Sequence, residues 1–183
     1  IKRMDQFPLL SKTGAKATIT LNRPEHHNRI DPADIPKIHE HLDAIEADPA
    51  IQLVVLTGMG HKTFSSGYTL DAILTRMDDS FQNMLGRIEK FAKPTICALN
   101  GSVYGGATDI VLACDLRVGL EGIEWRMPAT AIGLHYYPSG LQRYIQRMGI
   151  AASKRAFLTA RPFTWDQLDK LGLFEAFVKA ENF

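Results

Sequence analysis

Two glycines and an aspartate stand together in the stretch GSVYGGATDI, residues 101–110, at the expected start of a helix. Backbone N–H groups at a helix N-terminus, reinforced by the helix dipole, bind an anion or an oxyanion that forms during a reaction. Glycine also permits tight packing that a residue with a Cβ does not. Spacing alone therefore leaves two interpretations open, oxyanion stabilisation and close packing.

Strands and helices alternate around this stretch. Two short strands are predicted within 9–22, buried apolar strands at 51–58 and 94–99, and a further strand at 116–120. A chain of 183 residues is long enough for one domain with a sizeable core. We therefore expect a single α/β domain over residues 1–183, with substantial parallel strand pairing.

The helices are predicted from apolar residues at three- and four-residue spacing. The segment 31–48 has this pattern, with Asp31 as the expected N-cap and Pro32 as the first helical residue. A last short helix is expected to be capped by Thr164. Further helices are predicted at 69–77, at 81–91, after Gly106 to about residue 113, at 139–148 and at 150–158.

Composition excludes several classes of function. The net charge is +1 with both signs interspersed, which argues against a nucleic-acid surface, and no apolar run is long enough to span a membrane. Cys97 and Cys114 lie in apolar segments outside any metal-ligand spacing. They indicate buried thiols in a reducing, cytoplasmic compartment and no metal site. Because residue 1 is isoleucine, an upstream segment such as a removed targeting peptide stays open.

Four ordered blocks carry a resemblance to a known family: ITLNRPEHHNRI, VVLTGMGHKTFSSGYTLDAI, KPTICALNGSVYGGATDIVLACDLRV and AFLTARPFTWDQLDKLGLFEAFV. Their order and content resemble the crotonase, or enoyl-CoA hydratase/isomerase, superfamily. The resemblance implies a spiral of strand-strand-helix units, assembled as homotrimers or hexamers. It also implies an acyl-CoA thioester as substrate, with coenzyme A as part of that substrate and no separate cofactor.

The resemblance assigns roles to particular residues. The thioester oxygen would be held by the backbone N–H groups of Tyr68, after Gly67 in SSGY, and of Gly106 in YGGA. Coenzyme A would lie across the loop PEHHNR and the FSSG turn, although a solvated polar loop is the alternative. The residues expected to contact it are His27, Asn28, Arg29, Ser65, Ser66 and Gly67.

The two glutamates of the hydratases fall at Asp109 and Ala129. Alanine cannot serve as a general acid or base, which disfavours hydration by two carboxylates. GSVYGGA and IGLHY are similar to GSVWGGA and LGVPY of the methylmalonyl-CoA decarboxylase branch, so decarboxylation of a malonyl-type acyl-CoA is the preferred reaction. Tyr136 would then orient the carboxylate or assist protonation, and His135 could supply an imidazole.

Alternatives remain for each of these residues. Asp109 would otherwise cap its helix, Tyr136 would be an aromatic core residue and His135 a structural histidine. The function would otherwise be hydratase or isomerase activity with Asp109 alone, or a non-catalytic acyl-CoA-binding scaffold. Relatives continue for several tens of residues past the position of residue 183, so the C-terminal helices that close the acyl pocket are expected to be absent or incomplete here.

Overall fold

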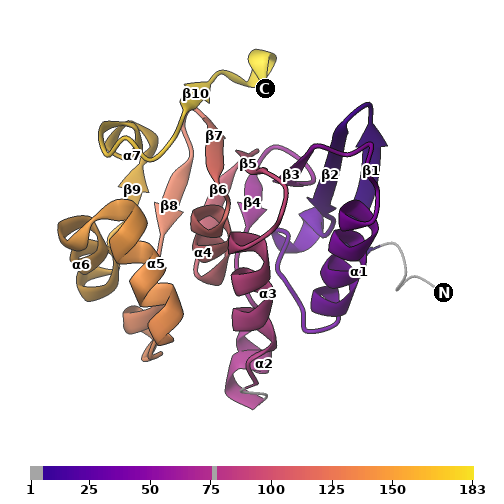
Figure 1. The fold of residues 1–183 in the computed structure, drawn as a ribbon. Helices are drawn as coiled ribbons and strands as arrows, with labels where there is room; N and C mark the ends of the chain where they lie inside the picture. Colours follow the sequence, from indigo (N-terminus) through magenta and orange to yellow (C-terminus); the bar gives the residue numbers. More distant parts are fainter. Residues whose placement is uncertain (1–5, 76–77) are drawn as a thin grey trace.

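The computed structural model describes residues 6–75 and 78–183, which form two β-sheets with helices packed around them (Figure 1). The larger sheet has the strand order β1-β2-β3-β5-β7-β10. β1 is antiparallel to β2, and the other neighbours are parallel, which confirms the predicted fold class. Its strands are Leu9–Thr13 (β1), Lys16–Leu21 (β2), Leu53–Gly58 (β3), Thr95–Leu99 (β5), Leu116–Leu120 (β7) and Ala176–Val178 (β10).

The smaller sheet consists of short strands in the order β4-β6-β8-β9, the first three of them parallel. Each of β4, β6 and β8 follows a strand of the larger sheet and precedes a helix, so the repeated strand-strand-helix unit is present (Figure 1). A strand of three residues is too short to show a period, which explains why the sequence does not predict β4 or β6. The strands are Thr63–Ser65 (β4), Ser102–Tyr104 (β6), Glu124–Arg126 (β8) and Phe163–Thr164 (β9).

Helices cover the sheets largely where they are predicted. Within the predicted helix 69–77, α2 ends at Thr75, and residues 76 and 77 lie outside the described residues. Thr164 forms the expected cap, a capping box with Gln167. The helices are Asp34–Glu46 (α1), Leu70–Thr75 (α2), Ser80–Glu89 (α3), Gly106–Ala113 (α4), Pro138–Met148 (α5), Ile150–Thr159 (α6) and Trp165–Lys170 (α7), with short 3-10 turns at Pro24–His26 (η2), Ala129–Ile132 (η3) and Ala180–Asn182 (η4).

The predicted start of α1 is wrong. The helix begins at Asp34, three residues after the expected N-cap, Asp31. The Asp31 carboxylate instead accepts hydrogen bonds from Thr69 Oγ1 and from Arg29 Nε, the latter at 3.1 Å. Asp34 Oδ2 accepts the Asp31 N–H at 2.8 Å, which closes a turn in front of the helix. The Asp31 carboxylate is thus taken up by a neighbouring side chain, Arg29, and by a distant one, Thr69, and does not cap the helix.

Helix α4 lies in the middle of the molecule, and its residues 107–113 are all buried. All but two of them are apolar, the exceptions being Thr108 and Asp109. A polar side chain in such a helix must find partners within the protein, because burial removes its water. Thr108 Oγ1 donates to Gly105 O at 2.6 Å and contacts the hydroxyl of Tyr144. The partners of Asp109 define the candidate site.

The two cysteines are free and buried, as predicted. Cys97 lies in β5, and Cys114 follows the last residue of α4. Burial raises the pKa of the Cys97 thiol well above its ordinary value, and the neighbouring Cys114 raises it further. Over the described ranges, no helix is both long enough and apolar enough to cross a membrane. The same residues contain no cluster of three or more His, Cys, Asp or Glu side chains suited to a metal ion.

Candidate active site

Two glycine turns lie against each other between β4 and the start of α4. In the first turn, Ser65 Oγ donates to Asn28 O at 2.7 Å and accepts the Gly67 N–H at 3.1 Å. Gly67 has φ +98°, and a Cβ there would lie 2.9 Å from Tyr104 O and 3.2 Å from Gly106 N. Only glycine combines this φ with this contact. Gly67 is thus fixed both by its backbone conformation and by close packing against the second turn.

The second turn brings the backbone nitrogen of Gly106 beside that of Tyr68. Gly105 precedes α4 with φ 58° and ψ −136°, a conformation that residues with a Cβ avoid. A Cβ on Gly106 would lie 4.0 Å from Tyr68 N. Gly106 is the first residue of α4, where the helix supplies no acceptor for its N–H. The two amide nitrogens thus lie close together at the positive end of the helix dipole.

Asp109 lies one helical turn beyond Gly106, on the same side of α4, and is fully buried. Its Oδ1 accepts a hydrogen bond from Arg143 Nη1 at 2.6 Å. Its Oδ2 accepts from the hydroxyl of Tyr136 at 3.1 Å and from the hydroxyl of Tyr137. The two tyrosine rings stack with centroids 4.3 Å apart. The carboxylate is therefore held by side chains of the 136–143 segment and does not cap its own helix.

Gly140, in the first turn of α5, makes room for this cluster. A Cβ at Gly140 would lie 2.8 Å from Asp109 Oδ2 and 2.7 Å from Cε2 of Tyr137, and would also overlap the ring of Tyr136. These distances are shorter than carbon-to-heavy-atom contacts allow. The absence of a side chain at Gly140 is what lets α5 approach the Asp109 carboxylate.

Arg143 joins Asp109 on α4 to Glu89 on α3. Its side chain is 3% exposed, with Nη1 2.6 Å from Asp109 Oδ1 and Nη2 3.1 Å from Glu89 Oε2. Burial by itself would lower the pKa of Arg143, but the two carboxylates raise it above its ordinary value. Its Nε is buried and has no partner among the described residues. The guanidinium thus compensates a buried negative charge between three helices.

The tyrosines of the cluster are held in their protonated form. Burial raises the pKa of Tyr136 and Tyr137 well above the ordinary value of about 10, and the Asp109 carboxylate raises both further. Burial likewise raises the pKa of Tyr144, whose hydroxyl contacts Thr108. At neutral pH these hydroxyls donate hydrogen bonds and carry no charge.

These raised tyrosine pKa values predict a loss of stability at high pH. The unfolded chain releases the phenolic protons above about pH 10, whereas the folded chain retains them, so stability is complete below pH 10 and falls as the pH rises further. Each such tyrosine should lower the free energy of unfolding by about 1.4 kcal/mol per pH unit. We expect Tyr144→Phe to reduce the loss of unfolding free energy by about 1.4 kcal/mol per pH unit, the contribution of one tyrosine. Urea unfolding between about pH 9.5 and 11.5 measures this slope. An unchanged slope would contradict the raised pKa of Tyr144.

The residues predicted to contact coenzyme A divide into buried and exposed groups. Asn28 and Ser65 are buried. Asn28 Nδ2 donates to two backbone carbonyls of the segment 59–63, at 3.0 and 2.9 Å, and Ser65 holds the Gly67 turn. These two side chains are occupied within the protein, where they shape the loop and the turn, and their predicted contact with coenzyme A stays a prediction. His27, Arg29 and Ser66 are exposed, and the Ser66 N–H donates to His27 O at 2.8 Å. The predicted binding loop and the glycine turn are thus joined.

His135 and Ala129 lie outside the Asp109 cluster. His135 is exposed, and its side chain forms no hydrogen bond or ion pair with the described residues. Its predicted role as the source of an imidazole stays a prediction. Ala129 is buried at the start of η3, and its carbonyl accepts the Leu134 N–H at 2.8 Å. A packed methyl group thus stands at the position where the resemblance places the second glutamate of the hydratases.

Comparison with known proteins assigns the family. The family model described as Enoyl-CoA hydratase/isomerase matches residues 12–183. The chain belongs to this family. Crotonyl-CoA hydratase of Syntrophomonas wolfei is 28% identical over 181 residues, which cover 95% of this chain and 70% of that protein. Short-chain-enoyl-CoA hydratase of Clostridium acetobutylicum is 28% identical over 178 residues, which cover 93% and 68%.

The fold of the enoyl-CoA hydratase/isomerase family is confirmed by solved structures. The crystal structure of enoyl-CoA hydratase from Bacillus anthracis superimposes with a TM-score of 0.88 at 25% identity, covering 96% of this chain and 71% of that one. The predicted superfamily membership and spiral fold are therefore correct. The decarboxylase branch within the superfamily stays a prediction.

Sequence reasoning missed part of this family member's charged cluster. Gly140, Arg143 and Glu89 were not singled out, and Tyr137 was not assigned a role in the site. The sequence does hold one signal, because Arg143 stands beside Tyr144 and Gly140 on the side of α5 that is buried. An arginine on the buried side of an amphipathic helix requires an acidic partner, and Asp109 in the apolar helix α4 requires a cation.

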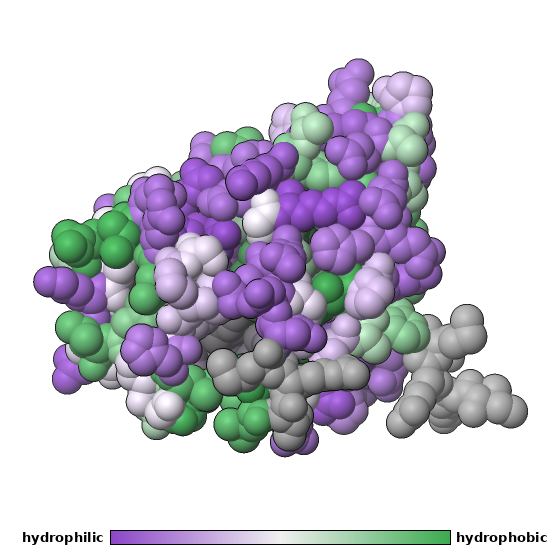
Figure 2. Space-filling model, turned by 60° about the horizontal axis from the view of Figure 1, so that its bottom comes forward, coloured by the Kyte–Doolittle hydropathy of each residue, from purple (hydrophilic) through white to green (hydrophobic). Residues whose placement is uncertain are grey.

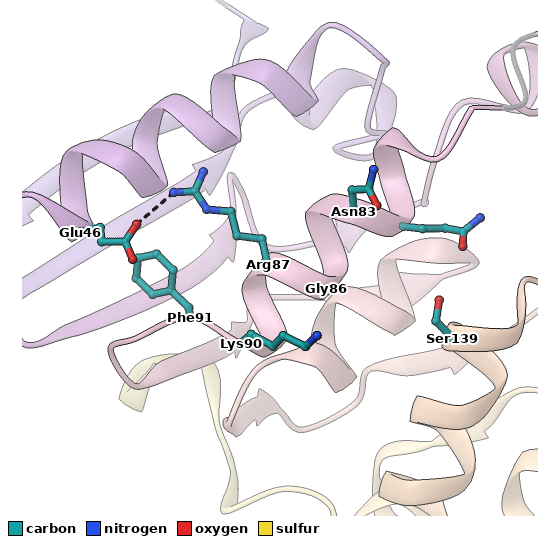
Figure 3. Close-up of a pocket in the computed structure, with 8 residues that line it drawn as sticks. Glu46, Asn83, Gly86, Arg87, Lys90, Phe91 and Ser139 are labelled. Carbon is teal, nitrogen blue, oxygen red and sulfur yellow. Dashed lines mark hydrogen bonds and ion pairs between the residues drawn. The ribbon is translucent and has the colours of Figure 1, made fainter.

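Two hollows lie away from the paired amides. The larger, about 480 Å³, is a groove along α3 in which Arg87 turns toward Glu46 and Lys90 and Ser139 border the open side (Figure 3). The smaller is a core cavity of about 10 Å³. Neither is lined by Tyr68, Gly106 or Asp109. The groove is lined by Glu46, Gln82, Asn83, Gly86, Arg87, Lys90, Phe91 and Ser139.

Proposed function

We propose that this protein binds an acyl-CoA thioester and stabilises its enolate with the backbone N–H groups of Tyr68 and Gly106. Support comes from the closeness of the two amide nitrogens and from the position of Gly106 at the N-terminus of α4. Preorganised donors of this kind contribute about 3 to 4 kcal/mol each to an oxyanion in a transition state. The coenzyme A moiety would lie against the exposed residues His27, Arg29 and Ser66, with Gly67 at the turn.

The reaction we propose is decarboxylation of a malonyl-type acyl-CoA. The observation that carries it is the state of the two acid positions, because both oxygens of Asp109 are bound to Arg143 and the tyrosines, and Ala129 has no titratable group. A carboxylate has about four acceptor positions, and Arg143 and the two tyrosines take three of those on Asp109, which leaves it little capacity to abstract a proton from water. Hydration by two carboxylates also needs a second acid or base, which Ala129 does not supply. Decarboxylation needs neither.

In the proposed reaction the bond between Cα and the substrate carboxylate breaks, and its electron pair enters the enolate. The negative charge then rests on the thioester oxygen, carbon dioxide leaves, and a proton supplied from solvent is added to Cα. Tyr136 and Tyr137 donate to the same oxygen of Asp109, so one hydroxyl can turn to the substrate while the other keeps the carboxylate bound. Tyr136 would orient the substrate carboxylate or deliver the proton.

Hydration of an enoyl-CoA is the second candidate function. It is favoured by the names of the relatives, which are a crotonyl-CoA hydratase and a short-chain-enoyl-CoA hydratase. In that reaction Asp109 would act alone on the water molecule, and a substrate would first have to displace one of the tyrosine hydroxyls from its Oδ2.

The test is incubation with malonyl-CoA, methylmalonyl-CoA and crotonyl-CoA, with product masses followed over time. We expect carbon dioxide loss from a malonyl-type ester, and a decrease of kcat by about 100-fold in Tyr136→Phe. Tyr104→Phe, whose hydroxyl interacts with Ser102 and Glu124, is the matched control and should retain activity. Hydration of crotonyl-CoA without decarboxylation would favour the second candidate. Binding of the esters without turnover would favour a non-catalytic scaffold.

We also propose that the protein assembles as a homotrimer or hexamer. The support is a set of exposed apolar side chains on α5 and α6, namely Ile145, Ile150 and Leu158. Figure 2 shows apolar side chains, coloured green, at the left edge of the molecule. Figure 1 places α5 and α6 on the same side. Light scattering coupled to size-exclusion chromatography measures the assembled mass, and a monomer at micromolar concentration would contradict the proposal.

A further inference from the structure

We propose that Phe81 determines the acyl-chain length that this protein accepts, by placing its ring against Gly106, the residue whose N–H would hold the thioester oxygen. The inference rests on the proposed function, because it concerns the acyl group of a thioester held at Gly106. We expect the protein to bind thioesters of short acyl groups and to exclude those of long ones.

The first observation is the contact between Phe81 and Gly106. A Cβ on Gly106 would lie 3.0 Å from both Cε1 and Cζ of the Phe81 ring. The tip of the ring therefore covers Gly106 at the first residue of α4. An oxygen that accepts the Gly106 N–H would have its substituents beside this ring.

The second observation is that Phe81 is held in place. It lies in the first turn of α3 and is 7% exposed. Its ring centroid lies 4.9 Å from that of Tyr68, the residue that supplies the other amide. A buried ring packed on a second ring loses its rotamer freedom, so it cannot swing aside at low cost for a longer chain.

The third observation concerns the other side of the bound group. Asp109 follows Gly106 by one turn on the same side of α4, and its carboxylate holds the stacked rings of Tyr136 and Tyr137. A thioester carbonyl has two substituents, and the sulfur side would face the exposed coenzyme A loop. The acyl side would then extend between Phe81 and the tyrosine pair. Aromatic rings on both sides leave room for a short group only.

The groove along α3 does not provide an alternative channel. Gly86 and Lys90 are among the residues that line it (Figure 3). Phe81 is absent from its lining and is one of the buried residues of α3. A long acyl chain starting at Gly106 would have to displace the Phe81 ring to pass α3. Truncating that ring should therefore extend the accepted chain length.

The experiment measures binding of saturated thioesters, which do not react, by calorimetric titration with acetyl-, butyryl- and octanoyl-CoA. Each methylene added to an acyl chain normally strengthens binding, because it removes apolar surface from water. A preference for the shorter chain therefore indicates that the longer chain is excluded sterically. We expect the wild-type protein to bind butyryl-CoA at least about tenfold more tightly than octanoyl-CoA, and Phe81→Ala to bring the two dissociation constants within about threefold. Phe91→Ala, which truncates a ring that lines the outer groove, is the matched control and should keep the wild-type preference.

The outcomes separate this inference from the function on which it rests. Absence of binding for all three esters would overturn the proposed acyl-CoA site itself. Equal affinities of the wild-type protein for butyryl- and octanoyl-CoA would overturn only the role of Phe81, as would an unchanged preference in a folded Phe81→Ala protein. If Phe81→Ala does not fold, Phe81→Leu provides the same test, because leucine keeps most of the packing but does not reach Gly106.

Discussion

Replacing Gly140 by alanine is expected to lower the free energy of unfolding by about 3 kcal/mol and to abolish activity. The added Cβ would lie 2.7 Å from a ring carbon of Tyr137 and 2.8 Å from Asp109 Oδ2, and would overlap Tyr136. These groups cannot move apart independently, because the rings stack and both hydroxyls bind Asp109. α5 would have to shift away from α4. Urea unfolding measures the stability, and turnover of the ester identified above measures the activity.

Gly86 offers a matched control for this substitution. It also lies inside a helix, α3, but a Cβ there would meet no atom within 4 Å. Alanine has the higher helix propensity, so Gly86→Ala should raise the free energy of unfolding by about 0.5 to 1 kcal/mol. If Gly140→Ala proved as stable as the wild-type protein, the close approach of α5 to Asp109 would be contradicted.

Replacing Arg143 by methionine is expected to cost about 3 to 5 kcal/mol of stability. The side chains of Arg143 and Asp109 are 3% and 0% exposed, so the substitution leaves a carboxylate in the core without its cation. Methionine fills much of the same volume, so the loss comes from the unpaired charge and only slightly from packing. Urea unfolding at neutral pH measures the effect.

The double variant Asp109→Asn with Arg143→Met distinguishes charge from packing. Removing both charges should be less costly than Arg143→Met alone, because no buried ion is left without a partner. The wild-type protein, Asp109→Asn, Arg143→Met and the double variant form a double-mutant cycle. We expect its coupling energy to be favourable and about 2 kcal/mol or more. Strictly additive costs would show that the ion pair contributes no more than its two side chains do separately.

The fold was largely predictable because its main signals are local. The apolar run 51–58 and the amphipathic pattern of α1 each follow from burial of one or both faces, which a single segment reveals. The second sheet was less predictable, since its strands are three residues or shorter and owe their pairing to neighbours distant in sequence. The cap at Asp31 failed for the same reason, because Thr69 binds its carboxylate.

The candidate site was predictable in its backbone and much less so in its side chains. Gly67 and the Gly105–Gly106 pair could be found because the positive φ of Gly67 and of Gly105 favours glycine, which leaves a recognisable pattern in the sequence. The role of Asp109 depends on Arg143, Tyr136 and Tyr137, which lie 27 to 34 residues further along the chain. Their meeting is set by how α5 packs on α4, and no local pattern encodes that packing.

The two buried thiols give the protein a built-in reporter of opening. Cys97 and Cys114 are the only cysteines in the sequence, both are fully buried, and the Cys97 pKa is raised by burial. A thiol reagent reacts with the thiolate, so the folded molecule should be inert and react only while β5 or the end of α4 is exposed. The labelling rate in excess reagent therefore measures how often the centre of the molecule opens, without any dye or substitution.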